Sequence, residues 1–153
     1  MILDIDVDIK YLHSVYTHNA LDYATQYSAG LDLRACFREQ SADIYPGDRL
    51  AIPAGIALQI KAPGIAGFVF SRSGLGTKKG LVVSQGVGVI DPDYRGEVVV
   101  SLMNTSREMR TVSQGQRIAQ LIFLPVYRAN LNPVDNLDNT SRGDGGFGHT
   151  GDD

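Results

Sequence analysis

The stretch "GVGVIDPDYRGEVVV", residues 86–100, joins two apolar runs through a run of turn-forming residues. Val87, Val89 and Ile90 come before the turn, and three consecutive valines follow it. β-Branched side chains fit the pleated surface of a strand, and Asp-Pro-Asp favours a reversal of the chain. The stretch therefore predicts a strand, a tight turn and a second strand.

The rest of the chain repeats this pattern of short apolar runs and turns. Within residues 2–10, apolar and charged side chains alternate strictly from Leu3 onward. Residues 55–61 repeat the period of two with Ile56, Leu58 and Ile60, and this pattern is typical of half-buried strands. Further apolar runs occupy residues 67–71, 96–104 and 116–126. Turn residues recur about every eight to twelve positions, and helical periodicity is almost absent, with residues 104–110 read as a turn. The sequence predicts an all-β sandwich or barrel.

Length and composition narrow the possible partners. A chain of 153 residues is one domain, and its net charge of −3 argues against a nucleic-acid partner, although a small anion could still bind a local basic pocket. The single cysteine, Cys36, excludes an internal disulfide and a paired-cysteine zinc site, and we expect it to be a small core residue. The acidic N-terminus and the absence of a long apolar run predict no signal peptide, no membrane span and a cytoplasmic location.

The C-terminal region differs from the rest in composition. After Pro125 the sequence becomes rich in Asn, Asp and Gly, so we predict a single β domain over residues 1–134 and a flexible arm over residues 135–153. The arm ends in "SRGDGGFGHTGDD", residues 141–153, where the glycine spacing formally matches a dinucleotide-binding motif. That motif needs a strand before it and a helix after it, and neither fits here.

The same C-terminal stretch still carries groups that suit a phosphorylated ligand. Glycines allow backbone N–H groups to approach a phosphate closely, and Arg142 could pair with a phosphate through two hydrogen bonds. Thr150 offers a hydroxyl, and Phe147 could stack on a flat ring. Taken alone, the stretch fits a plain flexible tail better than a binding site.

Three other stretches carry candidate functional groups, and each also has a purely structural interpretation. The stretch "SRSGLGTKKG", residues 71–80, lacks the P-loop spacing but offers cations, a hydroxyl and free backbone donors to a ligand. Its structural interpretation is a solvated loop that carries surface charge. Asp32, within "AGLDLRA" at residues 29–35, is a buried carboxylate that needs an Arg or Tyr partner, or it faces solvent. Asp91 also has two interpretations: it is a general base at the end of a strand, or it is simply the first residue of the turn.

Other catalytic arrangements find no support in the sequence. The three histidines His13, His18 and His149 have no metal-ligand spacing, and the Gly-x-Ser-x-Gly pattern of a serine nucleophile is absent.

Five stretches, taken in order, resemble the five motifs of the trimeric dUTPase (dUTP pyrophosphatase) family. They are "AGLDLRA" (29–35), "RSGLG" (72–76), "GVIDPDYRGE" (88–97), "GQRIAQLIF" (115–123) and "RGDGGFGHTG" (142–151). The resemblance implies a jelly-roll-like β-barrel that assembles as a homotrimer. It also implies hydrolysis of dUTP to dUMP and pyrophosphate, which limits uracil in DNA and supplies dUMP for dTMP synthesis.

The family's active site combines three subunits. Its first, second and fourth motifs come from one chain, the third from a second chain, and the C-terminal arm from the remaining chain. Mg²⁺ is implied as the cofactor, held mainly through the phosphates of the substrate, so no protein residue is expected as a metal ligand. Neither a nucleic acid nor a membrane is an expected partner.

The resemblance assigns roles to individual residues of the third motif. Asp91 matches the catalytic aspartate that orients and activates the attacking water at the α-phosphorus. Tyr94 matches the aromatic residue that packs on deoxyribose and leaves no room for a 2′-hydroxyl. Val89, Ile90 and the strand to Val99 match a β-hairpin whose backbone reads the edge of uracil.

The remaining roles concern the phosphates and their surroundings. Arg72, Ser73 and Gly74 match the phosphate-binding segment, and Gln120 matches a glutamine near the phosphates and the water. Asp32 matches an aspartate that supports the site indirectly. The arm that closes over the nucleotide is matched by Arg142, Phe147, Gly148 and Thr150.

Two positions depart from the family pattern. Gln85 stands where many members carry an asparagine that helps to bind the base, so its extra methylene puts the mode of uracil binding in doubt. Ser71 replaces a proline that often precedes the second-motif arginine, which predicts a slightly looser segment.

Two other functions remain as alternatives. One is dCTP deamination on the same fold, either alone or in a bifunctional deaminase–diphosphatase. It would need a glutamate with a positioned water, and Glu97 is the nearby glutamate. The other is a nucleotide-binding regulatory module without catalysis.

Overall fold

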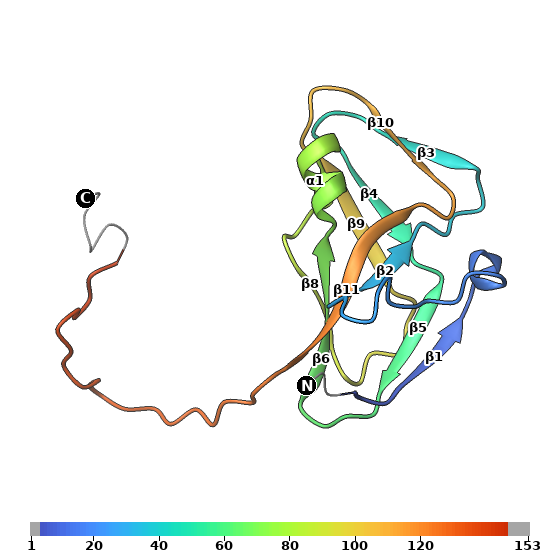
Figure 1. The fold of residues 1–153 in the computed structure, drawn as a ribbon. Helices are drawn as coiled ribbons and strands as arrows, with labels where there is room; N and C mark the ends of the chain where they lie inside the picture. The colour runs from blue at the N-terminus through green and yellow to red at the C-terminus, as the bar shows by residue number, and fades with distance from the viewer. Residues whose placement is uncertain (1–3, 147–153) are drawn as a thin grey trace.

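Eleven strands, one α-helix and one 3-10 helix make up the regular structure of residues 4–146, which the computed structural model describes (Figure 1). The strands are β1 (Val7–Tyr11), β2 (Leu31–Arg34), β3 (Ser41–Ile44), β4 (Arg49–Pro53), β5 (Ile56–Ile60), β6 (Ile65–Ser71), β7 (Leu81–Val83), β8 (Gly88–Ile90), β9 (Val99–Asn104), β10 (Arg110–Ser113) and β11 (Arg117–Pro125). The helices are η1 (Ser14–Tyr16) and α1 (Ser73–Lys79). The predicted all-β class is confirmed.

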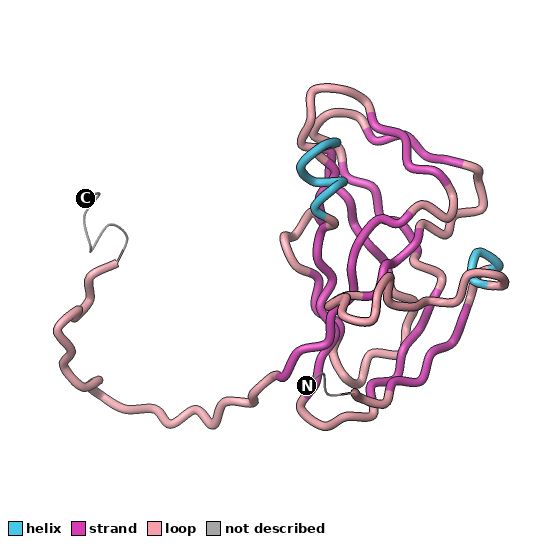
Figure 2. Tube along the Cα trace, viewed as in Figure 1, coloured by secondary structure: helices cyan, strands magenta, loops and turns pink. Residues whose placement is uncertain are grey.

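The strands form four antiparallel sheets in the described part of the chain (Figure 2). Their orders are β2-β11-β6-β8, β4-β9-β7, β1-β5 and β10-β3. The longest strand, β11, pairs with β2 on one side and with β6 on the other, where Ala119–Pro125 lie opposite Ile65–Ser71 in reverse order. This arrangement is compatible with the jelly-roll-like barrel that the family resemblance implies.

The core lies between these sheets. Leu33 of β2, Ile52 of β4, Leu102 of β9 and Leu121 of β11 are completely buried. Burial of each such side chain stabilises the fold by about 1.5–3 kcal/mol before entropy is counted. Cys36 belongs to the same core, which confirms its predicted role, and burial raises the pKa of its thiol to about 11.

The first strand is shorter than its alternation predicts. The pattern predicts a strand over residues 2–10, whereas β1 begins at Val7, opposite Ile60. Since β5 ends at Ile60, Asp4, Ile5 and Asp6 have no strand beside them. Where the strand exists, the alternation is correct: Val7 and Ile9 are half-buried, and Asp8 and Lys10 are exposed.

Helix α1 occupies residues that the sequence suggested were a loop. Leu75 is buried and anchors the helix to the core, while Gly80 adopts a left-handed conformation with φ +67° and ends it. A Cβ at position 80 would lie 2.8 Å from Ser106, so only glycine fits there. Seven residues span barely two turns, which is too short for helical periodicity to appear in the sequence.

The interpretation of residues 104–110 as a turn is confirmed. Asn104 is completely buried, and its side-chain amide donates to the carbonyl oxygens of Ile44 and Glu108, both at 2.8 Å. Its Oδ1 accepts hydrogen bonds from the backbone and the hydroxyl of Ser106. One amide side chain therefore fixes the connection between β9 and β10 through Ser106 and Glu108 and ties it to β3 through Ile44.

Beyond β11 the chain leaves the sheets. Val126 still donates to Gly64 O at 2.8 Å, but the hydrogen bonds of residues 127–146 are local ones, and Figure 1 shows this segment extending away from the strands. Four apolar side chains on it are largely exposed: Tyr127 (97%), Leu131 (87%), Val134 (64%) and Leu137 (86%). Such exposure leaves this apolar surface without a partner among residues 4–146.

Gly55 provides a test of the packing around Cys36. Its φ is +65°, and a Cβ there would lie 2.7 Å from Cys36 Sγ and 2.8 Å from His13 Cβ. We expect Gly55→Ala to lower the free energy of unfolding by at least about 2 kcal/mol, because strain and overlap add. Gly47→Ala is the control, since Gly47 has φ +84° but open space around it, and should cost only about 1 kcal/mol. Equal losses in urea denaturation would contradict this account.

Candidate active site

The two strands of the opening stretch do not pair with each other. β8 pairs with β6, and β9 pairs with β4 and β7, so the predicted hairpin is opened and its two arms enter different sheets. A cavity of about 220 Å³ lies between the arms, lined by Val89, Ile90 and Asp91 on one side and by Val98, Val99 and Val100 on the other. The remaining lining residues are Val69, Val83, Gln85, Gly88, Tyr94 and Glu97.

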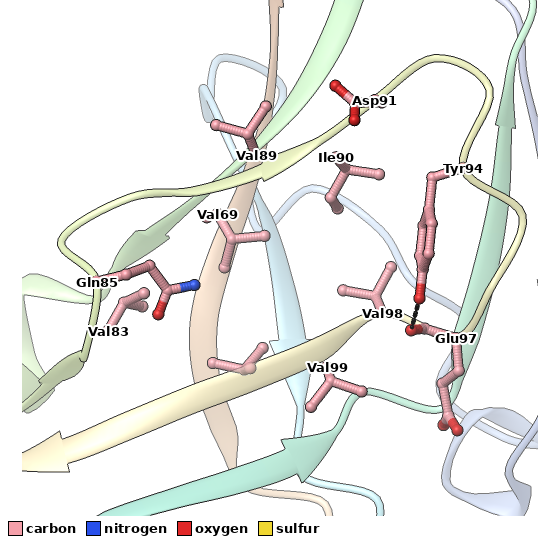
Figure 3. Close-up of a pocket in the computed structure, with 12 residues that line it drawn as sticks. Val69, Val83, Gln85, Val89, Ile90, Asp91, Tyr94, Glu97, Val98 and Val99 are labelled. Atoms are coloured by element: carbon pink, nitrogen blue, oxygen red, sulfur yellow. Dashed lines mark hydrogen bonds between the residues drawn. The ribbon is translucent and has the colours of Figure 1, made fainter.

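Asp91 and Tyr94 stand at one end of this cavity (Figure 3). Asp91 is exposed and directly follows β8, and its backbone oxygen accepts a hydrogen bond from Tyr94 N at 3.0 Å. Asp91 therefore does open the turn, and it also lines the cavity at that end. The Tyr94 hydroxyl donates to Glu97 O at 3.0 Å, and the ring packs so closely on Gly96 that a Cβ there would overlap it.

Gln85 lies on the other side of the cavity, across from Tyr94 (Figure 3). Its Oε1 accepts a hydrogen bond from the Ser84 hydroxyl at 3.1 Å. Val89 and Val99 are 62% and 50% exposed although they are large and apolar, because the cavity between the arms is open. An apolar slot with a few polar groups at its edges suits a flat heterocyclic ligand.

The side chain of Glu97 points away from the cavity (Figure 3). Its Oε1 accepts a hydrogen bond from Gly55 N at 3.0 Å, which ties the 91–98 segment to the connection between β4 and β5. This carboxylate therefore holds backbone and is not placed to activate a water at the cavity centre.

A second cluster of polar residues forms at the opposite end of β6. The Asp32 carboxylate, only 13% exposed, accepts from Arg72 Nε at 2.8 Å through one oxygen and from Arg117 at 3.2 Å through the other. Asp32 thus finds the partner that a buried carboxylate needs. One carboxylate holds two guanidinium groups, so the cluster keeps a net charge of about +1.

Gln120, Ser73 and Gly74 lie beside this cluster. Gln120 is directly opposite Asp32 in the β2–β11 pairing, and Ser73 and Gly74 begin α1 just after Arg72. Both residues are exposed, and the space around Gly74 is open. The N–H groups of a first helical turn have no partner within the helix and favour anions.

The segment at Ser71 is not looser, contrary to what we predicted from the replacement of the family's proline by serine. Its hydroxyl accepts a hydrogen bond from Val83 N at 2.8 Å, which links the end of β6 to the end of β7. Proline could not make this bond, so the serine provides its own restraint instead of loosening the segment.

The cavity and the charged cluster cannot serve the same reacting atom within one chain. Ile90 lies opposite Gly67 in the antiparallel pairing of β8 with β6. Asp91 lies one residue beyond this pair in one direction. Arg72, just after the end of β6, lies five residues beyond it in the other direction. At 3.2–3.4 Å per residue, six residues span about 20 Å. This separation exceeds the reach of an aspartate and an arginine toward one phosphorus atom.

Metal ligation by side chains alone finds no basis in residues 4–146. No group of three or more His, Cys, Asp or Glu side chains that could hold a metal ion occurs there. His13 uses Nδ1 to accept a hydrogen bond from Val15 N, at the start of η1. The described part also contains no helix long and apolar enough to cross a membrane.

The arm residues are only partly described. Arg142 donates from Nε to Gly145 O at 3.0 Å, within its own turn, and contacts neither cluster. The predicted residues Phe147, Gly148 and Thr150 lie outside the described residues.

Sequence reasoning missed three polar side chains that the structure connects to these clusters. Arg117 stands in the quoted stretch "GQRIAQLIF" without an assigned role, and only the pairing of β11 with β2 brings it to Asp32. The Ser84 hydroxyl lies within hydrogen-bond distance of both Gln85 and Ser101, and nothing in the sequence pattern marks the two serines.

The comparisons with known proteins all identify the same family. The family model described as dUTPase matches residues 17–151. Deoxyuridine 5'-triphosphate nucleotidohydrolases of Escherichia coli and Shigella boydii are 47% identical over 129 residues, which cover 84% of this chain and 85% of theirs.

Solved structures agree on the fold. A mutant dUTPase of Staphylococcus bacteriophage 80alpha with dUpNHpp has a TM-score of 0.82 at 22% identity, covering 95% of this chain and 98% of that one. A mutant dUTPase of phage phi11 of S. aureus, described with a structural Mg(II) ion, has a TM-score of 0.75 at 19% identity, covering 88% of this chain and 99% of that one.

The hydrogen bond from Gly55 to Glu97 generates a prediction about stability. Glu97→Ala leaves the Gly55 N–H without its acceptor, so we expect the free energy of unfolding to fall by about 1–2 kcal/mol. Glu97→Gln retains an acceptor oxygen at the same position and should lose clearly less. Chemical denaturation of both variants beside the parent protein measures the difference, and equal losses would argue that charge, not the hydrogen bond, matters.

Proposed function

This chain belongs to the dUTPase family and hydrolyses dUTP to dUMP and pyrophosphate, and we propose that it does so at sites that two or more copies build together. The observation that carries this proposal is the separation of about 20 Å along β6 between Asp91 and Arg72. A second copy can bring its charged cluster to the cavity of the first. A homotrimer, as in the family resemblance, satisfies this need in a closed assembly.

The cavity between β8 and β9 would bind the base and the sugar. Its volume of about 220 Å³ is below the roughly 300–1,000 Å³ of sites that enclose a drug-sized ligand, so it suits part of a nucleotide. Val89, Ile90 and Val99 would contact uracil, with unpaired backbone groups of the opened hairpin reading its edge. Tyr94 would pack on deoxyribose and exclude a 2′-hydroxyl, and Gln85 would bind the base from the opposite side.

The charged cluster of another copy would bind the triphosphate. Arg72 and Arg117 share one carboxylate, which fixes both guanidinium planes and leaves positive charge for phosphate oxygens. Ser73 and Gly74 would add hydroxyl and backbone donors, and Gln120 lies close enough to Asp32 to contact the phosphates or the attacking water. Asp32 then acts by orienting the arginines.

Asp91 would accept the proton of the attacking water and aim it at the α-phosphorus. Its exposed carboxylate at the mouth of the cavity supports this role, because the α-phosphate of a nucleotide with its base in the cavity would lie just outside it. Phosphoryl transfer depends mainly on positioning and on charge neutralisation, which the two clusters together would supply.

Mg²⁺ would be held mainly by phosphate oxygens of the substrate. The donor set fits this arrangement, since both oxygens of Asp32 already accept from arginines and no group of three or more His, Cys, Asp or Glu side chains gathers around Asp91 within residues 4–146. A hard cation that keeps several of its waters needs few protein ligands. Bound in this way, Mg²⁺ would neutralise charge on the triphosphate and favour departure of pyrophosphate.

The C-terminal segment would complete a neighbouring site. Tyr127, Leu131, Val134 and Leu137 expose apolar surface that a second copy could cover. The division into a domain over residues 1–134 and an arm over residues 135–153 is part of this proposal. Arg142, Phe147, Gly148 and Thr150 would then close over the nucleotide, with Phe147 on uracil and Arg142 toward the terminal phosphate.

The two alternatives receive less support. Deamination of dCTP would need Glu97 at the cavity centre, whereas its carboxylate binds Gly55 N. A regulatory module without catalysis would not need Asp91, which is present. We also propose a cytoplasmic location, where bacterial relatives would meet the deoxynucleotide pool.

The role of Asp91 is tested by Asp91→Asn. We expect dUTP to bind with little change and turnover to fall at least about a hundredfold, the scale of losing a general base. Pyrophosphate release from dUTP, measured with Mg²⁺ and with EDTA, gives the rate. Parallel assays with dTTP, dCTP and UTP, together with ammonia release from dCTP, check the substrate. Near-normal turnover of Asp91→Asn would remove this residue from the mechanism.

The role of the arm is tested by ending the chain after Asn139. The shortened chain should assemble as the full chain does, yet kcat/KM for dUTP should fall by about a hundredfold, since an arginine–phosphate pair and an aromatic stack are lost. A chain ending after Gly151 is the control, because it loses only two residues without an assigned role. Full activity of the shorter chain, with size-exclusion chromatography showing normal assembly, would contradict the proposal.

A further inference from the structure

Helix α1 begins with Ser73 and Gly74 of the proposed triphosphate site, and its other end contacts the connection between β9 and β10 (Figure 1). We propose that Arg110 is a positioning residue for triphosphate binding, because it clasps the last turn of α1 and so sets the direction in which the first turn meets the phosphates. This inference rests on the proposed function, and Arg110 lies outside all five motifs.

Helix α1 is too short to keep its direction without support. Its seven residues make about two turns, and isolated helices of this length are unstable in water. The Arg72 side chain, just before the helix, binds Asp32 and makes no hydrogen bond to the first turn. Within α1 only Leu75 is buried. The direction of the helix therefore depends strongly on the contacts at its C-terminal end.

Two side chains of the β9–β10 connection bind the carbonyl groups at that end. Arg110 Nε donates to Lys79 O at 3.0 Å, and the Thr105 hydroxyl donates to Gly80 O at 2.9 Å. The last carbonyl groups of a helix have no partner within it, and a cation beside them is favoured by the helix dipole. These contacts therefore supply what the short helix lacks.

Arg110 is itself held in place by its neighbours. The single hydrogen on Nε is shared between Lys79 O and the Ser106 hydroxyl oxygen, which lies 3.2 Å from Nε. The hydrogen of the Ser106 hydroxyl is directed to Oδ1 of the buried Asn104 at 2.7 Å, the nearer of its two acceptors. Arg110 Nη1 lies 3.1 Å from Glu108 Oε2. The guanidinium plane is thus fixed to the turn that Asn104 stabilises.

A change at one end of α1 affects the other end. At 1.5 Å per residue the helix is about 10 Å long, so a tilt of about 6° displaces its two ends relative to each other by about 1 Å. Such a displacement is large for groups that must meet phosphate oxygens at hydrogen-bond distance. Loss of the Arg110 bond would therefore weaken triphosphate binding without any direct contact between Arg110 and the substrate.

The charge of Arg110 is not what the inference depends on. Glu108 offsets it, and the side chain is only 27% exposed. Arg107, in the same turn, is an exposed cation that makes no hydrogen bond or ion pair within residues 4–146. Arg107 can therefore report the effect of charge alone.

The test compares two full-length variants that differ at the position of Nε. In Arg110→Gln the amide nitrogen lies as many bonds from Cα as Nε does, so a donor remains while the charge is lost. In Arg110→Met a methyl group takes this place, and the donor is lost as well. We expect Arg110→Met to raise KM for dUTP by about threefold to tenfold, the factor for one hydrogen bond, with a smaller change in kcat.

The two comparison variants should behave like the parent. Arg110→Gln should keep KM for dUTP within about twofold, because its donor still reaches Lys79 O. Arg107→Met is the matched control for lost charge and should also stay within about twofold, as is usual for an exposed charge.

A second ligand separates positioning of the phosphates from a general loss of structure. Deoxyuridine has no phosphate and would occupy only the cavity between β8 and β9. Its inhibition constant should therefore be the same for Arg110→Met and the parent, within about twofold.

Thr105→Val provides a second variant in case Arg110→Met folds poorly. Valine keeps the shape of threonine but lacks the hydroxyl that binds Gly80 O, and the backbone bond from Thr105 N to Gly80 O at 2.7 Å remains. We expect KM for dUTP to rise by about twofold to threefold, since only one of the two bonds to Gly80 O is lost, again with unchanged inhibition by deoxyuridine.

Three results would overturn the inference. One is an equal KM for Arg110→Met and Arg107→Met. Another is an equal rise in KM for Arg110→Gln and Arg110→Met, because charge and not the hydrogen bond would then matter. The third is a parallel weakening of deoxyuridine, which would indicate a general structural loss. All three leave dUTP hydrolysis by the parent enzyme untouched, whereas failure of the parent to release pyrophosphate from dUTP would instead reject the proposed function.

Discussion

The pairing of β6 with β11 governs how the two functional clusters relate to each other. Seven residues of each strand lie opposite one another, and the pair is flanked by β2 on one side and by β8 on the other. β2 brings Asp32 to Arg72 and Arg117 at the end of this sheet, whereas β8 delivers Asp91 toward the start of β6. Because a strand pair of this length is stiff, the distance between the two clusters is a fixed property of the fold.

The two strands of the 86–100 stretch, β8 and β9, do not pair with each other because other strands compete for them. Two strands joined by a tight turn would ordinarily pair with each other. Here β6 takes β8, and β4 and β7 take β9, so the backbone facing the cavity is left available for a ligand. Tyr94 and Glu97 stabilise this open form, since the tyrosine hydroxyl binds the backbone oxygen of Glu97 within the stretch, and the Glu97 carboxylate ties the stretch to Gly55 N between β4 and β5.

Local patterns in the sequence were enough to predict the strands but not their partners. Alternation identified β5, and apolar runs identified β6 and β11, because burial of one or both faces determines those patterns. The start of β1 depends on where its partner β5 ends, and α1 depends on the burial of Leu75 and the left-handed cap at Gly80, which are tertiary effects. For the site, the motifs gave Asp32 and Arg72, but the sharing of Asp32 with Arg117 joins residues 85 positions apart and left no local trace. Residues 147–153, which include three predicted arm residues, lie outside what the structure describes.

The exposed apolar residues at 127–137 relate the activity of the protein to its concentration, because a second chain could cover them. If every working site needs groups from more than one chain, an isolated chain is an incomplete enzyme, however well folded it is. Activity per chain would then follow mass action, rising with concentration until assembly is complete and falling on dilution. Catalytic output in a cell would respond more steeply than linearly to the level of expression, a form of control that needs no effector and no separate regulatory site.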